Sequence, residues 1–259
     1  MKFSIVTPAY NGMKFLPETG TSILSQSGPF DLEWLVIDGG STDGTVDYLR
    51  GLNDPRVRWV SEKDRGQSDA VNKGLAMAAG DVVGWLNADD LYTPGALAAI
   101  AEALDANPQK RWLVGRCDIV GPGGAEIRRS VTRYKDKLLA RYSYRGLLRE
   151  NPISQPAVFW RREFGARVGP IDVSLEHAMD YDLWLRMGRE GDPLLLDRLV
   201  AHFRLHDQSK SGTQTRERFR EQYLVASRYF GDDRASRWVH RFHVEKIVWA
   251  YRVMALVGN

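Results

Sequence analysis

The chain alternates short apolar runs with stretches of helical spacing. Four apolar runs predict strands, at residues 3–8, 35–38, 57–60 and 81–86. Three intervening stretches predict helices, at residues 14–26, around Val46 and Leu49, and from Ala70 to Ala78. Strands that alternate with helices in this way indicate a parallel sheet with right-handed crossovers and helices on both faces.

Acidic side chains follow the predicted strands. Asp38 ends the second strand, Asp64 lies just after the third, and Asp89 and Asp90 follow the fourth. Because carboxyl ends of parallel strands meet at one edge of a sheet, we expect these acids to lie together, where such folds bind ligands. Carboxylates gathered at one edge repel each other unless a cation or a donor-rich ligand lies among them.

Asp89 and Asp90, with Asn87 beside them, suit a divalent cation that carries phosphate. As acids at the surface end of a strand, both are expected to contribute little to the stability of the core. The alternative is that they only cap the helix predicted to start near Thr93. The turn after the first strand, Pro8 to Gly12, contains no G-x-G-x-x-G and no Walker A loop, which excludes those two nucleotide-binding motifs.

Four segments together resemble the family 2 glycosyltransferases. They are Thr7-Pro8-Ala9-Tyr10-Asn11, Ile37-Asp38-Gly39-Gly40-Ser41-Thr42-Asp43-Gly44-Thr45, Asp64-Arg65-Gly66 and Asn87-Ala88-Asp89-Asp90. The resemblance covers roughly residues 3–206. It implies the GT-A fold, an α/β, Rossmann-like, mostly parallel sheet flanked by helices. It also implies an inverting enzyme that moves a sugar from a nucleotide diphosphate sugar to an acceptor hydroxyl.

The resemblance also implies a set of site residues. Those expected to bind the nucleotide sugar are Pro8, Ala9, Tyr10, Asn11, Asp38, Asp64, Arg65, Asn87, Ala88, Asp89 and Arg204. Within this set, Asp38 would accept from the nucleobase imide, Tyr10 would line the base pocket, and Asp64 with Arg65 would lie near the base or ribose. Asp89, Asp90 and His206 are expected to bind the metal, Mg²⁺ or Mn²⁺.

The segment around His206 resembles a loop that closes over the nucleotide diphosphate in relatives. A neutral imidazole can complete a metal shell, while Arg204 or Lys210 would hold phosphate. A purely structural histidine is the alternative.

The catalytic base is expected on the helix that begins near Ala178, which resembles the family's acidic motif. Transfer to a hydroxyl needs a group that removes its proton. Asp180 and Asp182 both qualify, but residues two apart on a helix point about 200° away from each other. Asp182 has Arg186 four residues on, the spacing of a surface ion pair. Asp180 is therefore the predicted base; the alternative is that it only caps the helix.

Two departures from the family pattern keep other functions open. Asn87 stands where the Asp-x-Asp motif begins, and Met179 stands where a glutamate precedes the base. One alternative is a catalytically inactive homologue that binds nucleotide sugars. The other is a sugar nucleotidyltransferase, although the turn from Pro8 to Gly12 lacks the Gly-rich, basic loop that a triphosphate would need.

The composition fits a cytoplasmic enzyme. The chain has 259 residues and a single cysteine, Cys117, so it has no internal disulfide and suits a reducing compartment. The start runs directly into a strand, so no signal peptide is expected, and no apolar run approaches ~20 residues.

Positive charge is concentrated in two downstream segments. Residues 128–149 carry a net charge of +7 and residues 214–259 carry +4, against +3 for the whole chain. Either these are solvated helix faces, or they bind anionic lipid headgroups or a diphosphate-linked acceptor. No nucleic-acid-binding motif is present.

We predict a catalytic domain over residues 1–212, with a nucleotide-sugar half (1–110) and an acceptor half (111–212). A helical extension over 213–259 would follow. The extension would either lie on a membrane at the cytoplasmic face or form a cap or dimer contact that buries Trp238, Phe242 and Trp249. The acceptor would be a saccharide or a lipid-linked molecule, in the synthesis of cell-surface polysaccharide or glycolipid.

Overall fold

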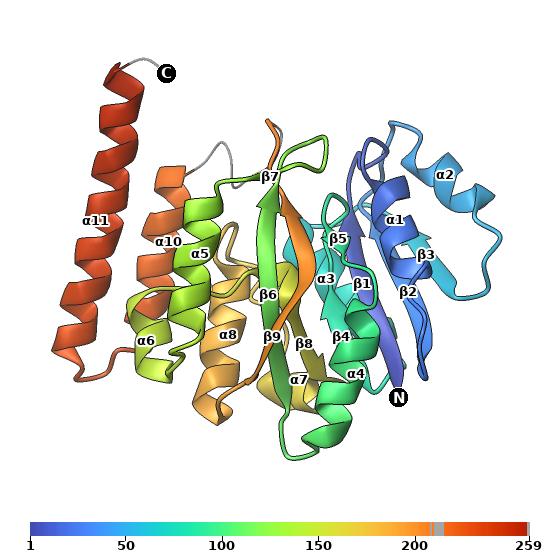
Figure 1. The fold of residues 1–259 in the computed structure, drawn as a ribbon. Coiled ribbons are helices and arrows are strands. Elements are labelled where there is room, and N and C mark those ends of the chain that lie inside the picture. Colours follow the sequence, from blue (N-terminus) through green and yellow to red (C-terminus); the bar gives the residue numbers. More distant parts are fainter. Residues whose placement is uncertain (208, 210–214, 258–259) are drawn as a thin grey trace.

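The computed structural model describes residues 1–207, 209 and 215–257, without the side chains of residues 215, 216 and 247–257 (Figure 1). The first part of the chain forms β1 (Lys2–Ala9), α1 (Leu16–Leu24), β2 (Asp31–Asp38), α2 (Thr45–Gly51), β3 (Val57–Ser61), α3 (Gln67–Met77), β4 (Val82–Trp85), β5 (Leu91–Tyr92) and α4 (Ala96–Ala106). The second part forms β6 (Trp112–Val120), β7 (Glu126–Ile127), α5 (Arg129–Leu139), α6 (Tyr144–Arg149), the 3-10 helix η1 (Gln155–Ala157), β8 (Val158–Arg161), α7 (Arg162–Val168), α8 (Met179–Glu190), β9 (Leu194–Arg204), α10 (Thr215–Ser227) and α11 (Arg234–Val257).

The strands form one sheet in the order β3-β2-β1-β4-β8-β6-β9-β5, with β7 paired to β6. β3, β2, β1 and β4 are parallel neighbours, which places Asp38 and the residues after β3 and β4 at one edge, as predicted. Beyond β4 the sheet is mixed, because β8 runs antiparallel to both β4 and β6. The predicted α/β fold class is confirmed.

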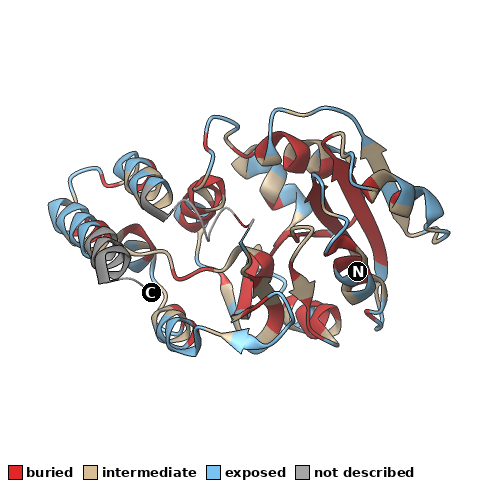
Figure 2. Ribbon diagram, turned by 90° about the horizontal axis from the view of Figure 1, so that it is seen from above, coloured by how far each residue is buried: buried red, intermediate tan, exposed pale blue. Residues whose placement is uncertain are grey.

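Helices cover both faces of the sheet, and the core lies between them and the strands (Figures 1 and 2). Seven of the eight residues of β2 are buried, so both faces of the strand pack against side chains. Trp34 on β2 belongs to the cluster on one face, and the neighbouring Leu35 belongs to the cluster on the other.

The carboxyl-terminal helices share the core of the sheet domain. Val225 and Ala226 at the end of α10, and Phe230 just after it, are buried in the same hydrophobic cluster as Trp184 of α8. On α10, the Glu221 carboxylate accepts hydrogen bonds from three consecutive backbone N–H groups, those of residues 176, 177 and 178, at 3.1, 2.6 and 2.7 Å. An acidic group bound to N–H groups at a helix start stabilises that helix, so α10 holds the first turn of α8. No helix within the described ranges is both long and apolar enough to cross a bilayer.

Candidate active site

A cavity of about 750 Å³ opens at the carboxyl ends of β1, β2 and β4, and we call it the strand-end cavity. Nine of the predicted site residues line it: Pro8, Ala9, Tyr10, Asn11, Asp64, Asn87, Ala88, Asp89 and His206. The Tyr10 side chain is 69% exposed, so an aromatic face is available at the cavity wall. A cavity of this size suits a small organic ligand.

Asp38 is buried beneath this cavity and does not line it. Its Oδ2 accepts hydrogen bonds from the N–H groups of Gly40 and Ser41, at 3.0 Å each, and from Ser61 Oγ at 2.7 Å. The Ser41 hydroxyl donates to the other oxygen. Asp38 therefore fixes the loop that follows β2, and its predicted contact with a nucleobase stays a prediction.

Of the Asp64-Arg65 pair, only Asp64 lines the cavity. A Cβ atom at Gly39 would lie 2.6 Å from Asp64 Oδ2, so glycine at position 39 leaves room for this carboxylate. The Arg65 side chain is 75% exposed and forms an ion pair with Asp69 at 2.8 Å. The Asp64 side chain therefore lies at the strand-end cavity, whereas the Arg65 side chain lies in solvent.

The turn after β4 is held by the Asn87 amide. Its Oδ1 accepts from Gln67 Nε2 at 2.7 Å and from Trp85 Nε1 at 2.9 Å. Its Nδ2 donates to Asp90 Oδ2 at 3.1 Å and to Gln155 Oε1 at 2.9 Å. An aspartate at position 87 would present an acceptor to two acceptors, which explains why the departure from Asp-x-Asp suits this chain.

Asp90 lies inside the protein, and it is not a surface acid as the sequence predicted. It is 0% exposed and does not line the strand-end cavity. Its Oδ1 accepts from the Arg204 N–H at 2.9 Å, because β9 runs past the turn and covers it. Burial raises the pKa of the Asp90 carboxyl well above its ordinary value, and the charge of Asp89 adds to that rise.

Asp89 and His206 meet across the cavity. His206 Nε2 lies 2.9 Å from Asp89 Oδ2, and the imidazole packs against the Phe15 ring with a centroid distance of 4.7 Å. Asp89 follows β4 and His206 follows β9. The sheet therefore places next to each other two side chains that are more than a hundred residues apart in the sequence. Lys210, predicted to hold phosphate, lies outside the described residues.

Arg204 is buried and bonded to protein groups on all sides. Its guanidinium donates to the Asp89 carbonyl at 2.9 Å, the Pro122 carbonyl at 2.8 Å and Glu18 Oε2 at 2.6 Å. It is 2% exposed, stacks over the Phe15 ring at 4.8 Å and does not line the cavity. The structure therefore places Arg204 as the support of the Asp89 loop, and its predicted contact with phosphate stays a prediction.

Replacing Arg204 with Met should lower the free energy of unfolding by about 2–4 kcal/mol, because the Asp89 and Pro122 carbonyl groups and the Glu18 carboxylate lose their donor. Chemical denaturation measures the change. Arg198→Met is the matched control on the same strand, since Arg198 is exposed, and it should shift stability by less than ~0.5 kcal/mol. Unchanged stability of the Arg204 variant, with selective loss of nucleotide binding, would instead assign Arg204 to the ligand.

A second cavity of about 460 Å³ lies among α5, α8, α10 and α11, and we call it the helix-lined cavity. Asp180, at the first turn of α8, lines it. Burial raises the pKa of Asp180 above its ordinary value, while the Tyr181 N–H bound to its Oδ1 at 2.7 Å and the charges of Lys135 and Arg218 limit the rise. A carboxylate of this kind is suited to accept a proton near neutral pH.

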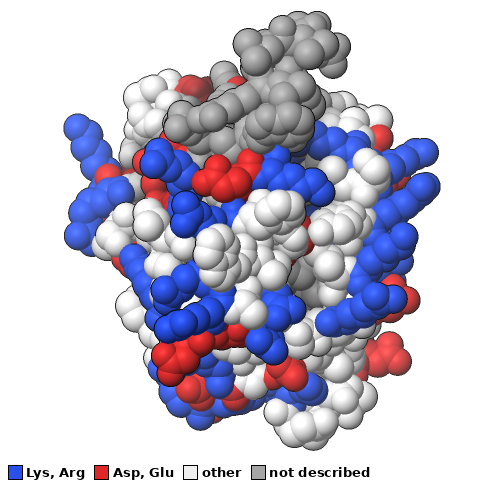
Figure 3. Space-filling model, turned by 90° about the vertical axis from the view of Figure 1, so that its left-hand side faces the viewer, with Lys and Arg blue, Asp and Glu red and all other residues white. Residues whose placement is uncertain are grey.

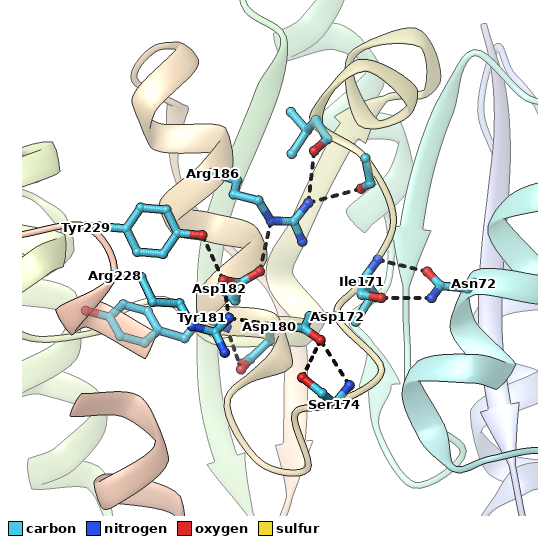
Figure 4. Close-up of polar contacts among 12 residues, drawn as sticks. Asn72, Ile171, Asp172, Ser174, Asp180, Tyr181, Asp182, Arg186, Arg228 and Tyr229 are labelled. Atoms are coloured by element: carbon cyan, nitrogen blue, oxygen red, sulfur yellow. Dashed lines mark hydrogen bonds and ion pairs between the residues drawn. The ribbon is translucent and has the colours of Figure 1, made fainter. Parts of the chain in front are cut away.

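Asp182 faces the other way, toward α10 and the loop after α7 (Figure 4). It is buried, accepts from Arg186 Nε and from the Tyr229 hydroxyl, both at 2.8 Å, and does not line the cavity. The ion pair with Arg186 predicted from the helical spacing is confirmed, but it is buried and not on the surface.

The two cavities adjoin. Gln67, Asn87 and Phe203 line both of them. Asp89 and His206 stand on one side of this shared wall, and Asp180 stands on the other. The two cavities are therefore neighbours that share these three lining residues.

Several cavity residues were missed in the sequence. Lys14, Phe15, Lys63 and Gln67 line the strand-end cavity, and Gln155 bonds Asn87 at the shared wall. Gln155 lies in the 3-10 helix η1, just before β8 begins at Val158. Lys14 and Lys63 lie close in sequence to the motifs that resemble the family, so their position could have indicated a role at the site. No feature of the local sequence indicates a role for Gln155.

Residues 4–163 match the family model described as glycosyl transferase family 2. The chain belongs to this family. The glycosyltransferase is 29% identical over 203 residues to an uncharacterised glycosyltransferase of Mycobacterium tuberculosis, covering 77% of this chain and 74% of the relative. It is 28% identical over 214 residues to chondroitin synthase of Escherichia coli, covering 80% of this chain but only 29% of the synthase.

Solved structures show the same architecture. Mannosyltransferase PcManGT from Pyrobaculum calidifontis, in complex with GDP-Man and Mn²⁺, superposes with a TM-score of 0.71 at 18% identity, covering 99% of this chain and 76% of that one. S. aureus TarS 1-349 in complex with UDP-GlcNAc gives 0.66 at 18% identity, covering 87% of this chain and 66% of that one. At such low identity the likeness establishes the fold, which is GT-A.

The strand-end cavity offers two donors for a metal ion. Asp89 provides a carboxylate and His206 an imidazole, while the residues that the structure describes contain no cluster of three or more metal-binding side chains. Mg²⁺ is commonly held by one or two carboxylates together with substrate phosphates. The donor set therefore fits a cation that is shared with a bound diphosphate.

Proposed function

We propose that this protein is an inverting glycosyltransferase that moves a sugar from a nucleotide diphosphate sugar to an acceptor hydroxyl. The observation that carries the proposal is the junction of the two cavities at Asn87. The Asp89–His206 pair lies in the first cavity and Asp180 lies in the second. The GT-A neighbours solved with GDP-Man and UDP-GlcNAc support a nucleotide sugar as donor.

The strand-end cavity binds the donor in this proposal. Tyr10 lies against the nucleobase, and Asp64 accepts from the base or ribose. Asp89 and His206 would hold Mg²⁺ or Mn²⁺ beside the diphosphate. When bound, the cation neutralises the charge that develops on the departing nucleoside diphosphate, which needs no proton donor.

The helix-lined cavity binds the acceptor. Asp180 removes the proton from the acceptor hydroxyl as the oxygen attacks the anomeric carbon. The diphosphate leaves on the donor side of Asn87 while the acceptor approaches from the other side. Attack opposite the leaving group inverts the configuration at the anomeric carbon.

The acceptor is a saccharide or a lipid-linked saccharide of a cell-surface polysaccharide or glycolipid. Chondroitin synthase and the hyaluronan synthase of Pasteurella multocida, 26% identical over 214 residues, are named for polysaccharides, which supports this class. This chain spans less than a third of either synthase, so their full activities are not transferred.

Incubation with a panel of nucleotide sugars and Mn²⁺ tests the proposal. Slow, metal-dependent hydrolysis of one sugar nucleotide, absent from the Asp180→Asn variant, is expected. Release of pyrophosphate from a nucleoside triphosphate and a sugar phosphate would instead indicate a nucleotidyltransferase. Binding of a nucleotide sugar without turnover under any condition would indicate an inactive homologue.

We further propose that the enzyme works at an anionic membrane surface, through α11. One face of this helix packs inward through Ser236, His240 and Val244. On the other face Trp238 and Phe242 are 70% and 67% exposed, so a cap that buries both is not what the structure contains; the Trp249 side chain lies outside the described residues. Many Lys and Arg side chains lie on this side of the molecule, interspersed with Asp and Glu side chains and with uncharged surface (Figure 3).

Binding to anionic liposomes should be strong at low salt and weak at high salt. Each Lys or Arg held close to an anionic membrane contributes about 1 kcal/mol, and salt screens that attraction. Exposed aromatic side chains add shallow insertion at the headgroup level. Co-sedimentation with anionic and neutral vesicles measures both effects.

The double variant Trp238→Gln, Phe242→Gln should bind vesicles more weakly than the wild type. Val173→Gln, another exposed apolar position away from α11, is the matched control and should leave binding unchanged. If the wild type does not bind anionic vesicles at low salt, or if Val173→Gln loses as much binding as the double variant, the proposal that α11 binds a membrane is wrong.

A further inference from the structure

The helix-lined cavity contains basic side chains that the transfer reaction does not use. Arg128, Lys135 and Arg149 line one wall, from the helices of the strongly basic segment 128–149, and Arg218 of α10 lines another. Some basic residues of segment 128–149 therefore line the cavity that also contains Asp180, and others do not. Arg133 and Lys137 of α5 are exposed and do not line the cavity.

Lys135 is a partly buried cation with a neutral partner. Its Nζ donates to Ser154 Oγ at 2.7 Å, and no ion pair of Lys135 is found in the described part of the chain. Burial lowers the pKa of Lys135, and the charge of Asp180 in the same cavity opposes that shift without cancelling it, so the ammonium lacks water that a charged group ordinarily keeps. An anionic ligand would compensate that loss directly.

Arg149 also has a neutral partner. Its Nε donates to Ser236 Oγ at 3.0 Å, and among the residues that the structure describes no carboxylate pairs with its guanidinium. The acid beside it in the chain, Glu150, already accepts from the Tyr134 hydroxyl at 2.8 Å and pairs with His243 at 3.2 Å. Lys135 and Arg149 thus face one cavity without compensation from Glu150.

We infer that the helix-lined cavity recognises an acceptor that carries a phosphate or diphosphate group, bound by Lys135 and Arg149 beside the hydroxyl that Asp180 deprotonates. Guanidinium and ammonium groups are the usual protein partners of phosphate. The inference rests on the proposed function, because it assigns this cavity to the acceptor. The phosphate can belong to a lipid carrier or to a phosphorylated saccharide, and both present the same chemistry to the two cations.

Calorimetric titration of the full chain in chelator-treated buffer tests the inference, since without a divalent cation the strand-end cavity binds diphosphates weakly. The probes are farnesyl diphosphate and glucose 1-phosphate, with farnesol and glucose as uncharged counterparts. Either phosphate should bind more tightly than its uncharged counterpart. The tighter of the two identifies whether lipid or saccharide carries the phosphate.

Lys135→Gln and Arg149→Gln should each weaken binding of the phosphate probe about ten- to a hundredfold, the effect of losing one charged hydrogen bond. Lys137→Gln, on the same helix but exposed, is the matched control and should bind normally. Glutamine at 135 keeps a donor for Ser154, and thermal denaturation of each variant confirms that it is folded. Binding of a nucleoside diphosphate with Mn²⁺ should be the same in all three variants.

The inference is overturned if wild-type protein binds no phosphate probe, if farnesol binds as tightly as farnesyl diphosphate, or if Lys137→Gln loses as much affinity as the cavity variants. Those results would leave the proposed function standing as long as the nucleoside diphosphate still binds. Failure of nucleoside diphosphate binding in wild-type protein would instead count against the proposed function itself.

Discussion

Replacing Asp180 with Asn should lower kcat by about 10²–10⁴-fold, the usual contribution of a general base. Asparagine keeps the shape of the side chain but cannot accept a proton from the acceptor hydroxyl. Asp180 does not line the strand-end cavity, where we propose that the donor binds, so the Kd of the nucleotide sugar should hardly change. Steady-state kinetics with the donor identified by the panel, together with titration of that donor, measure both quantities.

Asp182→Asn is the matched control, because it makes the same substitution two positions along α8. Asp182 is bonded to Arg186 and Tyr229 (Figure 4) and does not line the helix-lined cavity, so its loss should reduce stability. The rate per folded molecule should remain close to that of the wild type. A large loss of kcat in the Asp182 variant, with an active Asp180 variant, would place the base on the other face of α8.

The pH dependence provides a second readout of the same assignment. A general base works in its deprotonated form, so activity falls as pH drops through its pKa. Burial raises the pKa of Asp180, so this acidic limb should lie above the range of an ordinary aspartate. The limb should disappear in the residual activity of Asp180→Asn; a profile that keeps it would point to a different titrating group.

The parts of the fold that local pattern determines were predictable. β1, β2 and β4 are apolar runs buried on both faces, and the acids that follow β2 and β4 meet at one edge because these strands are parallel neighbours of β1. The choice between Asp180 and Asp182 also rested on local geometry, since helical spacing alone separates their directions. The structure places Asp180 at the cavity and Asp182 in the predicted ion pair.

What depends on distant segments was not predictable. Nothing near Asp90 in the sequence shows that β9 passes over it and that the Arg204 N–H becomes its partner. Arg204 is equally informative: an arginine near a predicted phosphate site looks like a ligand, but Glu18 and the Asp89 and Pro122 carbonyls occupy its donors. Burial of a charged group is a property of packing between distant segments, which the local sequence does not show.

The packing of the segment after the predicted boundary at residue 212 also depends on residues that are distant in the sequence. Its polar, basic composition and two helical stretches predict a separate extension. Its contacts with residues far earlier in the chain are not visible in the local sequence. Glu221 binds the N–H groups in front of α8, and Phe230 joins the core cluster of Trp184. The helices after residue 215 therefore position the turn that holds Asp180, and they complete the wall of the helix-lined cavity.

Replacing Asp89 with Ala should lower kcat/KM by about 10³-fold or more, because loss of the cation removes several kcal/mol of charge stabilisation from the departing diphosphate. Asp89 is partly exposed, and its carboxylate lies against His206 and not in the core. The melting temperature should therefore stay near that of the wild type. Titration of Mn²⁺ in the presence of the nucleoside diphosphate should show the loss of metal affinity independently of turnover.

Asp90→Ala separates a metal ligand from a residue that supports the loop. Its removal deprives the Arg204 N–H and the Asn87 amide of a buried acceptor, which should lower the free energy of unfolding by about 1–3 kcal/mol. Equal stability of both variants with equal loss of Mn²⁺ affinity would show that Asp90 also binds the metal, as the sequence predicts. Full activity of Asp89→Ala in chelator-treated buffer would show that the reaction needs no metal at this position. We expect a stable Asp89 variant that has lost Mn²⁺ affinity and a destabilised Asp90 variant, because of these two acids only Asp89 lines the strand-end cavity.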